Sequence, residues 1–157
     1  MPDPDSSAAD GSFSAQEREA MKSRAKELKT EAKRASAAQK AAADAADVSA
    51  KIAAMPEGDR QMSERLHSLV AEVAPDLAPK LYYGQPGYAR DGKVVCFFRS
   101  GQMDKQRYST FGFSPHAELD ASDGLWPTSY ALHNATEKAW DQLAELIARA
   151  ATGPSDS

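Results

Sequence analysis

The stretch KLYYGQPGYARDGKVVCFFR, residues 80–99, decides the fold of this chain. Its apolar runs fit the period of two that is typical of β-strands: Val94, Cys96 and Phe98 would share one face, and Val95 and Phe97 the other, so that both faces are at least partly covered. Asp91-Gly92 in its middle is a strong signal for a tight hairpin turn. We therefore predict two short strands, Lys80–Tyr83 and Gly87–Arg90, followed by this turn and a longer strand, Lys93–Arg99.

The same alternation continues toward the C-terminus. It predicts a fourth strand at Arg107–Phe113 and a fifth at Trp126–Leu132, with a loop or short helix at Ser114–Leu125 between them. Short strands joined by turns form antiparallel neighbours, because parallel neighbours need long crossover connections. The sequence therefore predicts an antiparallel meander of about five strands.

Two amphipathic helices flank the predicted sheet. Asp59 is the expected N-cap of the first, whose apolar residues repeat with helical spacing up to Pro75. Asn134 is the expected N-cap of the second, with Glu137 at the capping-box position. Helices beside an antiparallel sheet give a two-layer α+β fold.

The N-terminal part has a different composition, because fifteen of the 40 residues from Ala15 to Ala54 are alanine. We expect a helix from Ser14, its N-cap, to about Ala43, and a second short helix restarting at Asp44 or Asp47. Apolar residues recur with heptad-like spacing (Met21, Ala25, Leu28, Ala32 and Ala35). Alanine buries little area, so this pattern favours a solvated, weakly docked helix over a coiled coil.

These observations divide the chain into four parts. We expect a disordered tail over residues 1–13, a helical extension over 14–46, an α+β domain over 47–151 and a second disordered tail over 152–157. A chain of 157 residues has room for one such domain.

Composition excludes several classes of protein. No apolar run approaches the roughly 18 residues that span a bilayer, and the acidic N-terminus lacks the features of a signal peptide, so we expect a cytoplasmic protein without a membrane partner. The net charge of −4 argues against a dedicated nucleic-acid binder. Eight basic residues lie between Arg18 and Lys40, but the six acidic residues from Glu17 to Asp47 offset most of their charge, which favours a solvated face.

Few residues have the surroundings that enzyme chemistry needs. Cys96 lies in a Val-Val-Cys-Phe-Phe run and is expected to be a buried structural cysteine. His67 lies at the margin of its helix's apolar face. No nucleophile elbow, phosphate-binding loop or dinucleotide-binding motif is present, so we do not expect an enzyme.

Two groups of residues are candidate sites. His116 is followed by Glu118, Asp120 and Asp123, a set that could bind iron, manganese or zinc if the loop folds them together, although such residues are also ordinary in polar loops.

The second candidate is part of the aromatic set of the sheet. Tyr83, Tyr88 and Tyr108 could line a groove, with Arg107 as a partner for an anionic ligand.

Four segments together resemble the YdhG-like family of small bacterial proteins. They are LYYGQPGY from Leu81, GKVVCFF from Gly92, RYSTFGF from Arg107 and WPTSYAL from Trp126, in the order that the family has them. The resemblance covers about Val48 to Ala151 and implies a compact α+β domain of unknown function. One branch of the family is described as frataxin-like and linked to intracellular iron delivery.

The resemblance therefore implies a non-enzymatic domain that handles iron through surface carboxylates, with no other cofactor. Two alternatives follow from the residues themselves: a small-ligand or peptide-binding module lined by sheet aromatics, and a protein-interaction module that uses the N-terminal helix. We expect a monomer or weak dimer that binds a small ligand or an unidentified protein partner.

Overall fold

The computed structural model describes residues 14–152, and its internal contacts divide the chain into two units, one ending at Lys40 and the other beginning at Ala41. The two expected tails fall on residues 1–13 and 153–157, outside the described part. Thr152, which was assigned to the second tail, is the last residue of a helix.

The first described element is one long helix, α2 (Ala15–Ala53). The Ser14 hydroxyl accepts a hydrogen bond from the backbone N–H of Glu17 (2.9 Å), as a capping residue should. The predicted break before Asp44 or Asp47 is absent. The chain has neither glycine nor proline between Ala15 and Met55, and the high helix propensity of alanine outweighs the turn preference of two aspartates.

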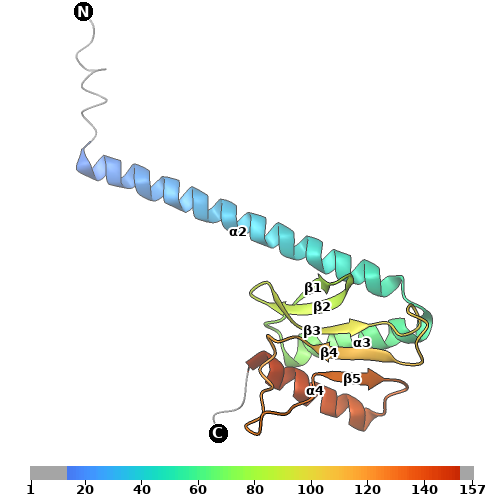
Figure 1. The fold of residues 1–157 in the computed structure, drawn as a ribbon. Coiled ribbons are helices and arrows are strands. Elements are labelled where there is room, and N and C mark those ends of the chain that lie inside the picture. Colours follow the sequence, from blue (N-terminus) through green and yellow to red (C-terminus); the bar gives the residue numbers. More distant parts are fainter. Residues whose placement is uncertain (1–13, 153–157) are drawn as a thin grey trace, which may run out of the picture. The chain divides into compact units, whose positions relative to one another are not determined.

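The second unit contains a five-stranded antiparallel sheet in the order β1-β2-β3-β4-β5 (Figure 1). Its strands are β1 (Ala78–Tyr82), β2 (Gln85–Arg90), β3 (Lys93–Arg99), β4 (Ser109–Phe113) and β5 (Ser129–Leu132). The predicted meander is therefore confirmed. The second strand begins two residues earlier than predicted, while the last two strands are shorter at their N-terminal ends.

Two tight hairpins set the register of the first three strands. Tyr83-Gly84 joins β1 to β2 and Asp91-Gly92 joins β2 to β3, and all four residues have positive φ. Such pairs form the turn whose twist matches that of the flanking strands. The predicted Asp91-Gly92 turn is confirmed. The predicted strand bounds left residues 84–86 as the first connection, but Gln85 and Pro86 pair with β1, so the turn is Tyr83-Gly84.

Two helices form the second layer. Helices α3 (Glu57–Val73) and α4 (Glu137–Thr152) lie beside one another (Figure 1). Their apolar residues pack with those of one face of the sheet to form the core. Leu66 of α3 and Ile147 of α4 are fully buried there. The last turns of α2 supply Val48 and Ile52 to the same core. The predicted α+β class is thus confirmed.

The starts of these helices differ from the predictions. Helix α3 follows Pro56, and Asp59 lies inside its first turn. The Asp59 side chain is buried and accepts hydrogen bonds from the β3–β4 loop instead of capping the helix. At α4 the capping oxygen is that of Thr136, which accepts from the backbone N–H of Ala139 (3.2 Å). Asn134, the predicted cap, has a left-handed backbone in the preceding turn.

In residues 14–152, no helix combines the length and the apolar character that crossing a bilayer requires.

Candidate functional site

The two faces of the sheet differ in what they present. On one face Tyr88, Cys96 and Phe113 lie in register across β2, β3 and β4 and belong to the core. Side chains alternate between faces along a strand, so Phe97 and Arg99 of β3 point the other way. We call this second side, where Phe97 is half-buried and Arg99 exposed, the open face.

An aromatic cluster, defined here as Tyr82, Tyr83 and Phe97, lies on the open face. The Tyr82 ring is 4.9 Å from the Phe97 ring and 4.6 Å from that of Tyr83, centroid to centroid. Gly112 of β4 is paired with Phe97, and a Cβ atom built there would lie 2.3 Å from the Phe97 ring. Glycine at this position therefore allows the ring to lie directly on the β4 backbone.

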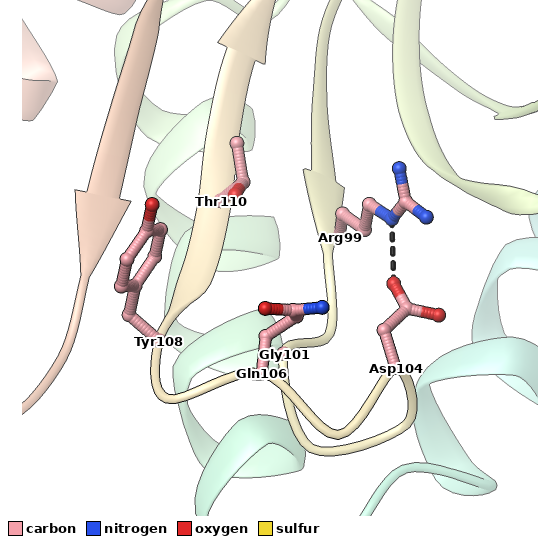
Figure 2. Close-up of a pocket in the computed structure, with 6 residues that line it drawn as sticks. All are labelled: Arg99, Gly101, Asp104, Gln106, Tyr108 and Thr110. Carbon is pink, nitrogen blue, oxygen red and sulfur yellow. Dashed lines mark hydrogen bonds and ion pairs between the residues drawn. The ribbon is translucent and has the colours of Figure 1, made fainter.

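A hollow of about 260 Å³ lies next along the same face, where Arg99 is paired with Thr110. Figure 2 shows its walls, which come from the ends of β3 and β4 and from the loop between them. It is lined by Arg99, Gly101, Asp104, Gln106, Tyr108 and Thr110. Phe97 is two residues before Arg99, so the hollow and the aromatic cluster are adjacent.

One arginine, Arg99, lines the hollow, and a second, Arg107, lies beside it. Arg99 Nε donates to Asp104 Oδ2 at 2.6 Å, which fixes both side chains at one wall (Figure 2). The Arg107 guanidinium lies over the Tyr108 ring, 5.0 Å from its centroid. Tyr108 is 38% exposed, so part of its side chain remains open to solvent. The hollow thus offers an aromatic surface and polar groups, and the Arg107 cation lies next to its Tyr108 wall.

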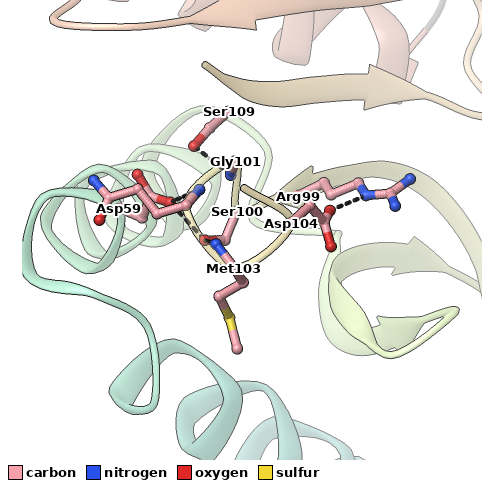
Figure 3. Close-up of polar contacts among 8 residues, drawn as sticks. Asp59, Arg99, Ser100, Gly101, Met103, Asp104 and Ser109 are labelled. Atoms are coloured by element: carbon pink, nitrogen blue, oxygen red, sulfur yellow. Dashed lines mark hydrogen bonds and ion pairs between the residues drawn. The ribbon is translucent and has the colours of Figure 1, made fainter. Parts of the chain in front are cut away.

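The loop between β3 and β4 is held by a buried carboxylate (Figure 3). Asp59 Oδ2 accepts from the Ser100 hydroxyl (2.5 Å) and from the backbone N–H of Gln102 (2.9 Å). Gly101 in turn donates its N–H to the Ser109 hydroxyl (3.0 Å). A Cβ at Gly101 would lie 2.0 Å from the Tyr108 carbonyl oxygen, so this loop passes against β4 as only glycine allows.

The four ligand residues predicted from sequence are placed in three locations. Arg107 and Tyr108 lie together beside the hollow. Tyr83 is 89% exposed in the β1–β2 turn, within the aromatic cluster. Tyr88 is 1% exposed and lies in the core on the other face, so the structure separates it from the other three.

Burial also sets the ionisation of that core. The Tyr88 hydroxyl lies 2.9 Å from Nδ1 of His67, which gives this histidine at the helix margin a partner. Burial, and to a lesser extent the neighbouring Cys96, raises the pKa of Tyr88. Burial alone raises the pKa of the Cys96 thiol to about 12, so the cysteine is a protonated core residue at neutral pH, as predicted.

The four predicted metal ligands lie along the loop between β4 and β5. His116 and Glu118 line one hollow together with the cations Arg90 and Lys93, and Glu118 lies 3.8 Å from Arg90. Within residues 14–152, no group of three or more histidine, cysteine or acidic side chains has a geometry suited to a metal ion.

The remaining two candidates, Asp120 and Asp123, do not line that hollow. Asp123 accepts a hydrogen bond from the backbone N–H of Leu125 (3.3 Å), which is ordinary turn chemistry.

Sequence reasoning did not select Arg99, Asp104 or Gln106. A signal for them was available, because Asp104 and Gln106 belong to the turn Gly101–Gln106, and Arg99, just before it, shares its face with Phe97 by alternation. The role of Asp59 had no such signal, because its partners lie more than forty residues away in the chain.

No family model, no curated protein and no solved structure matches this chain.

Proposed function

We propose that this protein is a binding domain, not an enzyme, that takes a small planar anion on the open face of its sheet. The single observation that carries the proposal is the hollow beside the aromatic cluster, where Tyr108 offers an exposed ring next to Arg107 and Gln106. Small-molecule sites combine an apolar or aromatic wall with a few fixed polar groups, and this hollow has both.

The chemistry of the walls suggests the class of ligand. An aromatic ring packs against Tyr108 or Phe97, and a carboxylate pairs with a guanidinium through charge-assisted hydrogen bonds. The volume of about 260 Å³ suits a ligand with one ring. An aromatic carboxylate satisfies both requirements.

The experiment is a two-dimensional NMR titration with 4-hydroxybenzoate, and with 4-hydroxybenzamide as its uncharged counterpart. We expect shifts confined to Arg99, residues 101–110 and Phe97, and weaker binding of the amide. Tyr108→Ser should remove the shifts, whereas Tyr83→Ser, at an 89% exposed tyrosine that does not line the hollow, should retain them. Shifts spread over the whole domain, or equal loss in both variants, would refute the proposal.

The resemblance to YdhG-like proteins stays a prediction, although the α+β class that it implies is the class observed. The iron-handling role that it implies also stays a prediction. The cation Arg90, which lies 3.8 Å from Glu118, does not favour metal binding at this carboxylate. Titration of the protein with Fe(II) under anaerobic conditions, monitored at His116 and Glu118, tests it directly.

A further inference from the structure

The first part of α2, residues 15–40, has a charge that the composition of the whole chain conceals. It holds eight basic and four acidic residues, a net charge of +4, in a chain whose total is −4. The remaining residues therefore carry −8. We call residues 15–40 the arm; all of its side chains are exposed.

The basic residues of the arm are not scattered around the helix. At about 100° per residue, six of the eight fall within an arc of about 80°. This basic stripe consists of Arg18, Lys22, Lys26, Lys29, Lys33 and Lys40. With a rise of about 1.5 Å per residue it extends for about 33 Å. Three of the four acids, Glu17, Glu27 and Glu31, fall on the opposite side of the helix.

This arrangement is unfavourable for the helix alone. Consecutive members of the stripe from Arg18 to Lys33 are three or four residues apart, a spacing at which like charges destabilise a helix. Among residues 14–152, no carboxylate lies within ion-pair distance of any of the six. The ion pair that the arm does contain, Arg24 with Glu27 at 3.4 Å, lies off the stripe. An external anion would remove the repulsion.

We propose that the basic stripe binds the phosphate backbone of nucleic acid. A row of cations without aromatic or amide side chains suits a regular row of phosphates, where affinity comes from the release of condensed counterions and needs no base contacts. The acidic net charge, which argued against such binding, is the sum of a basic arm and an acidic remainder.

The apolar content of the arm argues against a lipid surface as the partner. Membrane-surface helices insert a face of large apolar side chains. In the arm, the exposed large apolar residues are Met21 (55%) and Leu28 (49%), and they lie beside the stripe, not within it. The other apolar residues with heptad-like spacing are Ala25, Ala32 and Ala35, and alanine buries little area.

The test is fluorescence anisotropy of the full chain with a labelled 25-base-pair DNA duplex over a series of KCl concentrations. Six phosphate contacts predict a slope of log K against log salt of about −5, and hence about a thousandfold loss of affinity between 50 and 200 mM salt. Single-stranded DNA of the same length should give a somewhat shallower slope. Absence of binding to both at 50 mM salt overturns the proposal.

Two double variants with equal charge change separate the stripe from net charge. Lys26→Gln with Lys29→Gln removes two stripe cations, and Arg24→Gln with Arg34→Gln removes two that lie off it. We expect the first to reduce the magnitude of the slope by about 2 and the second to leave it nearly unchanged. Circular dichroism of both variants confirms that the helix is retained, and equal effects on the slope would overturn the assignment to the stripe.

Two further measurements decide between partners. Vesicles of phosphatidylcholine with 30% phosphatidylserine should bind more weakly than DNA at the same salt concentration, and stronger binding to vesicles overturns the proposal. Sedimentation equilibrium at the protein concentrations of the assay tests whether the chain associates with itself through the stripe. We expect no self-association that depends on Lys26 and Lys29. Such an association would assign the stripe to a second copy of the chain instead.

Discussion

The arm of α2 and helix α4 are both regular helices rich in alanine and charged residues, yet they are held by different forces. Five residues of α4 are buried, among them Trp140 and Ile147, whereas no side chain of the arm is. The arm is held by its backbone bonds, by the preceding cap Ser14 and by local side-chain contacts such as the Arg24–Glu27 pair and the bond from the Thr30 hydroxyl to the Lys26 carbonyl. Helices gain most of their stability from packing an apolar face. Secondary structure alone therefore does not show which part of this chain is stabilised by tertiary packing.

The largest effect is expected in the core of the α+β unit. Phe98 is fully buried between the sheet and the helices, and Phe98→Ala should lower the free energy of unfolding by about 3–5 kcal/mol. Leu28→Ala in the arm is the matched apolar truncation and should change it by less than about 0.5 kcal/mol. Urea denaturation measures both, and a comparable loss in the arm would break the contrast.

A smaller loss is expected at the buried carboxylate. Asp59→Ala leaves the Ser100 hydroxyl and the Gln102 N–H without their acceptor, which should cost about 1–3 kcal/mol. The same variant should shift the NMR signals of residues 99–110, because this loop forms a wall of the hollow. Glu72→Ala, an exposed acidic residue on the same helix, is the control and should leave both the stability and those signals unchanged.

A still smaller effect concerns an ion pair between α3 and α4. Arg65 donates to both carboxylate oxygens of Glu137 (2.9 and 2.7 Å), and this bond lowers the pKa of Glu137. The pair therefore contributes stability above the unfolded-state pKa of glutamate, and this contribution is lost as the pH falls through the lowered value. An NMR titration should show the pKa of Glu137 rising in Arg65→Gln. An unchanged pKa would show that the pair does not form in solution.

The smallest effect on stability is expected from the largest change to the chain, a deletion of the arm and the residues before it. Removal of residues 1–40 should leave the urea midpoint of the remaining chain unchanged, because the core residues of α2, Val48 and Ile52, lie beyond the cut. The far-ultraviolet circular dichroism should lose the helical signal of the arm. A lowered midpoint would show that the arm stabilises the domain.

Local sequence signals were sufficient for much of the fold. The alternation in residues 93–99 and the Asp91-Gly92 turn predicted β3 and its hairpin correctly. Errors arose where one residue type suits two roles. Asp59 suits an N-cap position, but its carboxylate instead accepts hydrogen bonds from the distant β3–β4 loop. Asn134 also suits an N-cap, but it has a left-handed backbone in the preceding turn, and Thr136 is the cap.

The site was only partly predictable for a related reason. Arg107 and Tyr108 are neighbours in the chain, so their proximity follows from the sequence. Tyr88 was grouped with them by composition, but the face of the sheet to which it belongs depends on its pairing with Cys96. The register of the Asp91-Gly92 hairpin alone would pair Tyr88 with Val95, but a bulge between Tyr88 and Ala89 moves the pairing to Cys96. A shift of one residue exchanges the two faces of the sheet, and this bulge was not predicted from the sequence.

The strand order has a consequence for how this sheet meets other proteins. A meander leaves β1 and β5 as edges whose outer backbone groups could template a further strand. Here β1 contains Pro79, which has no N–H to offer, followed by Lys80, and β5 has four residues. Short edges interrupted by proline and lysine resist strand addition and fibril growth. Strand addition and edge-to-edge aggregation are therefore disfavoured for this sheet at high protein concentration, and contacts through its broad surface are favoured instead.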